Sequence, residues 1–186
     1  MGNKESVPVF TEDELRMYRD LTVFSKNEIR HVYQKFQALG TKDKPVTRDS
    51  KIPREDLYRL KELRINPFKD RMVTVFSSSK DGSMTFEDFL DMMSVFSEKS
   101  TKQIKAEYVF RIYDFDEDGY LGWEDIRTVI SLLTGEEKLK ETDMYQLIEN
   151  MYNEGDVDDD GTLSFVEFEN MMDNCPDIVR NFRFRL

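Results

Sequence analysis

Carboxylates are concentrated in two short stretches of this sequence. Residues 114–125 (DFDEDGYLGWED) contain six acidic side chains, residues 156–167 (DVDDDGTLSFVE) contain five, and neither stretch has a basic residue. The formal net charge of -11 arises in these stretches, because the rest of the chain has 27 acids and 27 bases. Like charges this close together repel one another and need a counter-ion. Oxygen-rich clusters of this kind suit hard divalent cations such as Ca²⁺ and Mg²⁺.

Residues 156–167 fit a twelve-residue loop that offers oxygen ligands at positions 1, 3, 5, 7, 9 and 12 and turns at a glycine in position 6. Gly161 occupies the turn, and Ser164 at position 9 acts through water. Glu167 at position 12 has the length to bind through both oxygens, which favours the larger coordination shell of Ca²⁺. We expect a Ca²⁺ site with these ligands: Asp156, Asp158, Asp160, the carbonyl of Thr162, and Glu167.

Residues 114–125 fit the same template with two departures. Gly122 at position 9 has no side chain, so water must serve there, and Asp125 at position 12 is one methylene shorter than glutamate. Six-coordinate geometry with several waters is what Mg²⁺ requires. We therefore expect a weaker Ca²⁺ site that also accepts Mg²⁺, with these ligands around the Gly119 turn: Asp114, Asp116, Asp118, the carbonyl of Tyr120, and Asp125.

Amphipathic helices are predicted on both sides of each loop, because apolar residues recur there at spacings of three and four. The recurring residues are Ala106, Val109, Phe110 and Tyr113, then Ile126, Val129, Ile130 and Leu133, and around the second loop Ile148, Met151, Tyr152, Phe168, Met171 and Met172. Leu121 and Leu163 share position 8 of their loops. A short antiparallel contact between them is expected to pair the two loops into one lobe.

The first half of the chain repeats this pattern without the ligands. Residues 77–88 (SSSKDGSMTFED) keep the turn glycine and an apolar position 8, Met84, but they offer neutral hydroxyls and Lys80 where anions are needed. Residues 38–56 form a longer loop with no ligand set. Ser25 and Glu28 predict a capping box, and Pro53 and the pair Asn66 and Pro67 predict further helix starts.

These patterns predict an all-α protein with two lobes of paired helix-loop-helix units, two degenerate and two functional, and helical extensions at both ends. The expected divisions are an N-terminal extension (1–24), an N-terminal lobe (25–97), a C-terminal lobe (98–173) and an amphipathic C-terminal tail (174–186). Residues 176–186 have apolar side chains on one helical face. We expect this tail to cover a groove of the C-terminal lobe until a partner helix displaces it.

Composition argues against several classes of function. A negative chain without a basic patch disfavours nucleic-acid binding. A single histidine, His31, and the absence of a nucleophile or phosphate-binding motif disfavour an enzyme. A lone cysteine, Cys175, allows no zinc cluster and no internal disulfide. The chain has neither a membrane-spanning run nor a signal peptide, so we expect it in the cytosol or nucleus.

The first residues, MGNKES, match the acceptor pattern for N-myristoylation at Gly2, with Ser6 in the final position of the motif. A single myristoyl chain gives marginal membrane binding, with a constant of about 10⁴ M⁻¹. We therefore expect a cytoplasmic protein that is attached reversibly at the periphery of the plasma membrane.

Five segments resemble the calcium- and integrin-binding proteins, small EF-hand proteins with two functional C-terminal motifs. They are MGNK, ELRINPFKDR, FLDMMSVFSE, RIYDFDEDGYL in the loop that ends at Asp125, and CPDIVRNFRFRL. The resemblance spans essentially the whole chain, and MGNK is most similar to members two and three of the family. It implies the same ligands in both loops, since an aspartate at the last position of the earlier loop is a family trait.

The resemblance also implies an adaptor that binds amphipathic helical segments in the cytoplasmic tails of membrane proteins. Integrin α subunits and components of mechanosensory (mechanotransduction) channels are the implied partners. Two alternatives remain at this stage: a regulatory subunit similar to the calcineurin B homologous proteins, and a passive Ca²⁺ buffer.

Overall fold

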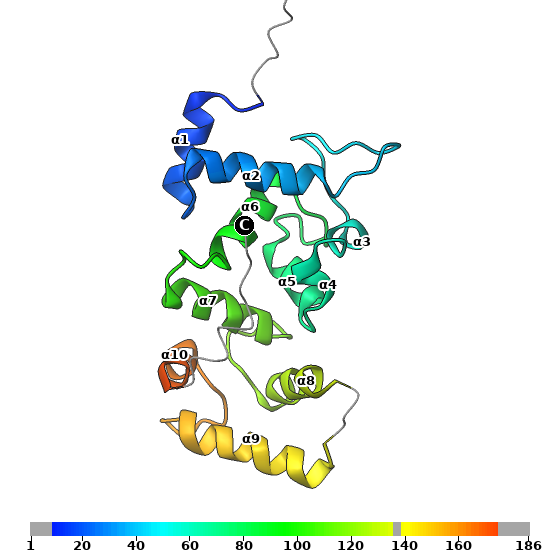
Figure 1. Ribbon diagram of the computed structural model, residues 1–186. Helices are drawn as coiled ribbons and strands as arrows, with labels where there is room; N and C mark the ends of the chain where they lie inside the picture. The colour runs from blue at the N-terminus through cyan, green and yellow to red at the C-terminus, as the bar shows by residue number, and fades with distance from the viewer. Residues whose placement is uncertain (1–8, 136–138, 175–186) are drawn as a thin grey trace, which may run out of the picture.

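The computed structural model describes residues 9–135 and 139–174, and in this part of the chain it contains ten α-helices and two isolated β-bridges (Figure 1). The helices are α1 (Glu12–Leu21), α2 (Lys26–Gln37), α3 (Arg54–Leu57), α4 (Lys61–Arg64), α5 (Lys69–Phe76), α6 (Phe86–Val95), α7 (Lys102–Tyr113), α8 (Trp123–Thr134), α9 (Glu141–Gly155) and α10 (Phe165–Asn174). Helices α1–α6 form the N-terminal lobe and α7–α10 the C-terminal lobe. The all-α prediction is confirmed.

Side-chain caps explain where several helices begin. The predicted capping box at Ser25 and Glu28 opens α2. The predicted start at Asn66 and Pro67 is wrong, because α5 begins at Lys69. The Asn66 Oδ1 atom accepts the N–H of Phe68 at 2.9 Å, and this local turn competes with helix formation. Pro53 lies at the N-cap of α3, one residue before the helix.

Three of the loops share one backbone conformation. The turn glycines Gly82, Gly119 and Gly161 have φ angles of 77°, 89° and 81°, and a residue two positions earlier in each loop also has a positive φ. Glycine adopts this conformation without the steric cost of a Cβ atom. Loop 77–88 therefore keeps the loop geometry although it has lost the ligands, as the sequence predicts.

Two β-bridges pair the loops. Leu121 and Leu163 exchange backbone hydrogen bonds of 2.9 and 3.0 Å, as expected from their shared position in the two loops. Ile52 and Met84 form the equivalent bridge, with two bonds of 2.9 Å. Ile52 thus corresponds to position 8 of a metal loop, but the long segment before it hides this correspondence in the sequence. Each lobe is thus a pair of helix-loop-helix units.

A continuous apolar core joins the two lobes. Helix α7 crosses the middle of the molecule in Figure 1 and packs on α5 and α6 of the N-terminal lobe. Its Val109 and Ile112 are fully buried. Leu133, which the sequence pattern places on an inward face, is half-exposed at the end of α8. None of the helices within 9–135 and 139–174 has the length and apolar character of a membrane span.

The N-terminal extension folds onto the N-terminal lobe through Phe10 and α1. The Phe10 ring is buried among the rings of Tyr18, Tyr33 and Phe86, at centroid distances of 5.1 to 6.0 Å. Arg48 reaches from the loop after α2 and binds Glu14 and the Tyr18 hydroxyl. Helix α1 is therefore an integral part of this lobe.

Candidate metal centre

Loop 114–125 begins where α7 ends. Asp114 caps that helix: its N–H donates to the Phe110 carbonyl at 2.9 Å, and its buried carboxylate accepts the N–H groups of Asp118 at 3.2 Å and Gly119 at 3.0 Å. Burial raises the pKa of the Asp114 carboxyl group. A cation that neutralises this carboxylate compensates for its lost hydration.

The side chains at positions 1, 3 and 5 of this loop converge. One carboxylate oxygen from each of Asp114, Asp116 and Asp118 lies within 4.8 Å of the other two. Asp118 also accepts the N–H of Tyr120 at 2.9 Å, which fixes position 7 beside position 5. The structure thus brings together the side-chain ligands predicted for the first half of the loop, close enough to share one divalent cation.

Loop 156–167 repeats the hydrogen bonds of loop 114–125, but a different set of its carboxylates converges, and the predicted ligand Asp160 lies outside that set. The Asp156 carboxylate accepts the N–H groups of Asp160 at 3.2 Å and Gly161 at 2.9 Å. Asp160 in turn accepts the N–H and the hydroxyl of Thr162, both at 2.8 Å. Here the converging group consists of Asp156, Asp158 and Glu167, again within 4.8 Å. Desolvation, together with the charges of Asp160 and Glu167, raises the pKa of Asp158.

Position 12 is an aspartate in the earlier loop and a glutamate in the later one. Asp125 and Glu167 are both buried, and each uses its two oxygens to accept the N–H groups of positions 2 and 9, at 2.8 to 3.0 Å. Glu167 is one of the three converging carboxylates of its loop. In the described part of the earlier loop the converging carboxylates are those of positions 1, 3 and 5, and Asp125 is not among them. The extra methylene of Glu167 therefore brings its carboxylate nearer to the other ligands.

The donor set of both loops fits a hard cation. The converging groups consist of carboxylate oxygens alone, which suit Ca²⁺ and Mg²⁺ and lack the thiolate and imidazole ligands that softer metals prefer. Tyr152 lies between the loops and donates to the Leu121 carbonyl at 3.3 Å. Burial and the charges of Asp125, Asp156 and Asp160 raise the pKa of Tyr152 to about 12. Carboxylates of both loops therefore lie within electrostatic reach of the Tyr152 hydroxyl group.

Loop 77–88 uses its polar groups on one another. Ser77 donates to the Ser83 carbonyl at 2.7 Å, and Asp81 accepts the hydroxyl of Ser79 at 2.8 Å together with the N–H and hydroxyl of Ser83. These hydrogen bonds, above all those of Ser83, lower the pKa of Asp81. The hydroxyl groups of this loop thus form hydrogen bonds within the loop, and the absence of a metal from it stays a prediction.

An apolar cavity of about 270 Å³ lies beside the two metal loops in the C-terminal lobe. Its lining includes Leu121 and Leu163, which bridge the loops, and three methionines. The lining residues are Tyr113, Leu121, Ile126, Val129, Ile130, Leu133, Leu147, Met151, Leu163, Phe168, Met171 and Met172. Tyr113 and Ile126 are the immediate neighbours of Asp114 and Asp125. The loops and the cavity therefore share both backbone segments and side chains.

The predictions for Gly2 and for the tail 174–186 fall outside the described part of the chain, since that part omits residues 1–8 and 175–186 and the Asn174 side chain.

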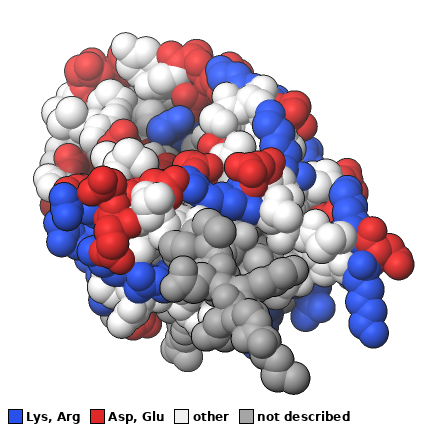
Figure 2. Space-filling model, turned by 90° about the horizontal axis from the view of Figure 1, so that it is seen from above, with Lys and Arg blue, Asp and Glu red and all other residues white. Residues whose placement is uncertain are grey.

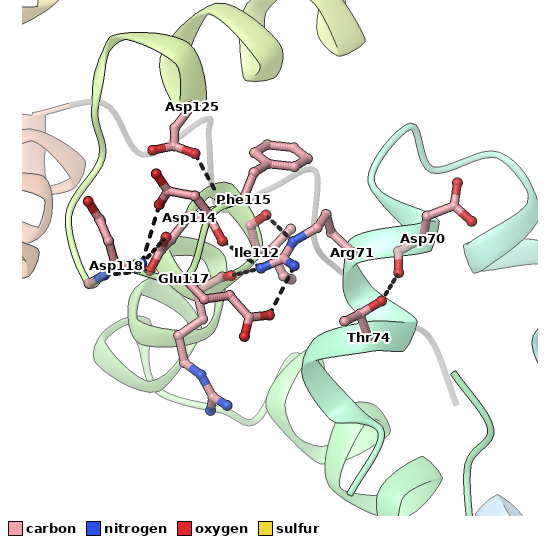
Figure 3. Close-up of polar contacts among 12 residues, drawn as sticks. Asp70, Arg71, Thr74, Ile112, Asp114, Phe115, Glu117, Asp118 and Asp125 are labelled. Atoms are coloured by element: carbon pink, nitrogen blue, oxygen red, sulfur yellow. Dashed lines mark hydrogen bonds and ion pairs between the residues drawn. The ribbon is translucent and has the colours of Figure 1, made fainter. Parts of the chain in front are cut away.

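Sequence reasoning missed one residue that contributes to loop 114–125. Arg71 of α5 donates to the Asp114 carbonyl and to Glu117 (Figure 3). The sequence could have indicated this role, because Arg71 is a cation beside the apolar residues of α5.

Comparisons with known proteins agree with this geometry. The family described as an EF-hand domain pair matches residues 103–173, which contain both metal loops. The chain is 40% identical to calcium and integrin-binding family member 2 of Drosophila melanogaster and 38% identical to the human member 2. It is also 38% identical to the human family member 3. Each of these matches covers 100% of both chains. This decides between the two families considered from the sequence: the chain belongs to the calcium and integrin-binding family of EF-hand proteins.

Proposed function

We propose that this protein is a Ca²⁺- and Mg²⁺-responsive adaptor that binds amphipathic helical segments in the cytoplasmic tails of membrane proteins. Integrin α subunits and mechanotransduction channel components are the proposed partner classes. The relatives are named for binding calcium and integrin, which supports a binding protein over an enzyme. Loop 156–167 is proposed to hold Ca²⁺, and loop 114–125 to hold Ca²⁺ more weakly and to accept Mg²⁺.

The apolar cavity beside the metal loops is the observation that carries this proposal. An apolar pocket with a few flexible methionines suits the apolar face of a helix, because methionine adapts to varied shapes. Leu121 and Leu163 take part both in the bridge between the loops and in the cavity wall. A change of loop shape on metal binding is therefore transmitted directly to the receiving surface.

Binding of helical peptides tests the adaptor proposal. Labelled peptides from integrin α tails and from channel cytoplasmic segments are titrated with the full chain, and fluorescence anisotropy is measured in Ca²⁺, in Mg²⁺ and in chelator. Leu133→Asp is the test variant, because Leu133 lines the cavity and is 52% exposed, so the fold tolerates the change. Ile65→Asp is the control, since Ile65 is exposed on the N-terminal lobe.

We expect metal-dependent binding that Leu133→Asp weakens at least about tenfold, since a charge must lose its hydration in the occupied cavity. Ile65→Asp should bind as the unmodified chain does. Equal binding by both variants would show that the cavity does not receive the peptide. If no peptide binds and the exposed apolar surface is the same with and without Ca²⁺, the chain is a passive buffer.

Myristoylation at Gly2 is proposed as the membrane attachment, and with it a cytoplasmic location at the periphery of the plasma membrane. The match of MGNKES to the acceptor pattern supports it. Figure 2 shows that Lys and Arg are interspersed with Asp and Glu on the face seen from above, so this face offers little net attraction to anionic lipid. Attachment is therefore proposed to be reversible and assisted by the partner.

Fractionation of eukaryotic cells tests the attachment. Gly2→Ala should move the protein from the membrane fraction to the cytosol, whereas Ser83→Ala, a control far from the N-terminus in sequence, should leave its distribution unchanged. An equal distribution of Gly2→Ala and unmodified protein would rule out the lipid as the anchor.

A further inference from the structure

Arg71 lies where the N-terminal lobe meets the metal-binding lobe. On either side of it, the ring pairs Phe68–Tyr113 and Phe76–Tyr108 hold α5 against α7, at centroid distances of 5.0 and 4.7 Å. The Arg71 side chain is only 14% exposed. A guanidinium group that is shielded from water needs hydrogen-bond acceptors nearby, and the positions of these acceptors determine where the Arg71 side chain points.

The acceptors of Arg71 are at the end of α7. Its Nη2 atom donates to the carbonyls of Arg111 at 3.0 Å and Asp114 at 2.5 Å, and its Nε atom donates to the carbonyl of Ile112 at 3.4 Å. Figure 3 shows the side chain reaching from α5 to this turn. The last carbonyls of a helix lack intrahelical partners and carry the negative end of the helix dipole. Arg71 therefore caps α7 from the other lobe.

This cap fixes the first metal ligand of loop 114–125. The Asp114 N–H is held by the Phe110 carbonyl at 2.9 Å, and its own carbonyl is held by Arg71. With the backbone of Asp114 restrained on both sides, its carboxylate stays directed at the N–H groups of Asp118 and Gly119. A loop already held in this shape loses less conformational freedom when it binds a cation.

The positive charge of Arg71 acts in the opposite direction, because it repels a cation in the loop. Three features reduce this repulsion. Glu117, at position 4 of the loop, accepts from Nη1 at 3.2 Å and balances the charge. The guanidinium lies over the Phe115 ring, 5.5 Å from its centroid. It binds the backbone carbonyl of Asp114 and two carbonyls of α7 rather than the converging carboxylates. These features weaken the repulsion and leave the organising effect of the cap in place.

We propose that Arg71 is a positioning residue that raises the metal affinity of loop 114–125 and couples the occupancy of that loop to α5. The inference rests on the proposed metal binding by this loop. Among the described residues, loop 156–167 receives no such side chain from the N-terminal lobe, so its affinity should not depend on Arg71. Because coupling is reciprocal, an ion in loop 114–125 should in turn stabilise α5.

Two-dimensional NMR of the full chain resolves the two loops. The N–H groups of Gly119 and Gly161 donate to the first carboxylate of their own loops, so each reports the binding of a cation to that loop. Mg²⁺ and Ca²⁺ are titrated into the unmodified chain, Arg71→Met, Arg71→Lys and Arg59→Met. Arg59 is the matched control, since its guanidinium caps the Leu39 carbonyl at 3.0 Å within the N-terminal lobe.

Arg71→Met should lower the affinity reported by Gly119 about tenfold, the usual effect of losing a group that orients a ligand. Arg71→Lys keeps the charge and the packing of α5 on α7 but loses the planar fork, so it should show a similar loss and also serves if Arg71→Met does not fold. Gly161 should respond equally in all variants, and Arg59→Met should match the unmodified chain. A higher affinity in Arg71→Met would show that charge repulsion dominates and would overturn the proposal.

Hydrogen exchange gives the second reading. Mg²⁺ should slow exchange of the buried α5 amides Met72 and Val73 in the unmodified chain and leave them unchanged in Arg71→Met. Equal protection in both proteins would overturn the coupling. If Gly119 of the unmodified chain does not respond to any cation, the proposed metal site fails and this inference fails with it. An unchanged affinity in Arg71→Met and Arg71→Lys overturns the inference alone.

Discussion

Replacing Glu167 by glutamine keeps the size of the side chain and removes its charge and one acceptor oxygen. The Glu167 carboxylate accepts the N–H of Val157 at 2.8 Å and both the N–H and the hydroxyl of Ser164, at 2.9 and 2.7 Å. Hydrogen bonds from Ser164 and Val157 hold the pKa of Glu167 below its usual value, although Asp156 and Asp158 lie nearby. These hydrogen bonds of the fold therefore favour the ionised side chain.

The side-chain amide of the Glu167→Gln variant supplies a single acceptor oxygen, so one N–H group of the loop is left without its partner. We expect this to cost about 1–2 kcal/mol of the free energy of unfolding at pH 7, in the lower part of the range for an unpaired buried donor. For a chain of this size that corresponds to a decrease in Tm of roughly 2–8 °C. Because the pKa of Glu167 is lowered by folding, its contribution is present above the unfolded pKa and is lost as pH falls through the folded value. The difference in the free energy of unfolding between the unmodified chain and Glu167→Gln should therefore become smaller as pH falls.

The Ca²⁺ affinity of loop 156–167 should fall at least about 100-fold in Glu167→Gln, since the change removes a ligand and not only its support. Thermal unfolding in chelator and calorimetric titration with Ca²⁺ measure the two effects. Glu149→Gln, on the exposed side of α9, makes the same chemical change without touching the loop. A variant with unchanged Ca²⁺ affinity would remove Glu167 from the ligand set. A Tm in chelator equal to or above that of the unmodified chain would refute the hydrogen-bond argument.

Three further changes test other parts of the structure. Asp125→Glu should raise the preference of loop 114–125 for Ca²⁺ over Mg²⁺, measured by competition calorimetry, and an unchanged ratio would contradict the argument from side-chain length. Phe10→Ala should lower the free energy of unfolding by about 3–5 kcal/mol in urea titrations, because the ring is buried; a loss below about 1 kcal/mol would mean that α1 is only loosely attached. Hydrogen bonds from Lys99 and Ser25 lower the pKa of Glu28 to about 2, so its contribution is complete above its unfolded pKa and disappears as pH falls towards 2. Glu28→Gln should therefore be less stable than the unmodified chain at pH 7 and similar to it near pH 2, and a constant difference would argue against an ionic contribution.

The backbone of the two acidic loops and the pairing of these loops were the most predictable part of this protein. Each predicted ligand set lies within twelve consecutive residues, and a glycine with a positive φ fixes the path of the backbone. The spacing of the residues in the sequence therefore predicts which side chains lie close together. The prediction that Glu167 and Asp125 differ follows from a single methylene. The pairing of Leu121 with Leu163 was equally accessible, because both residues have the same place in a repeated unit.

Features that depend on distant segments were not predictable in this way. The Ile52–Met84 bridge lies behind a long loop that interrupts the repeat. The Phe10 ring packs against rings from three different helices, and no local sequence pattern predicts these contacts. Helical periodicity placed Leu133 inward, but the cavity at the end of α8 leaves it half-exposed. In each case the tertiary contact, and not the local preference, determines the outcome.

Arg71 shows what kind of sequence signal could still reveal such a contact. It lies three residues after Phe68 and one before Met72, so the apolar face of α5 has a cation beside it. A buried cation must find acceptors, and the unpaired carbonyls at the end of a neighbouring helix are a ready supply of them. In a chain of paired helix-loop-helix units, that helix end is also the start of a metal loop. A cation on an otherwise apolar helix face is therefore a reason to look for a partner loop in the adjacent unit, even where the sequence separation hides the connection.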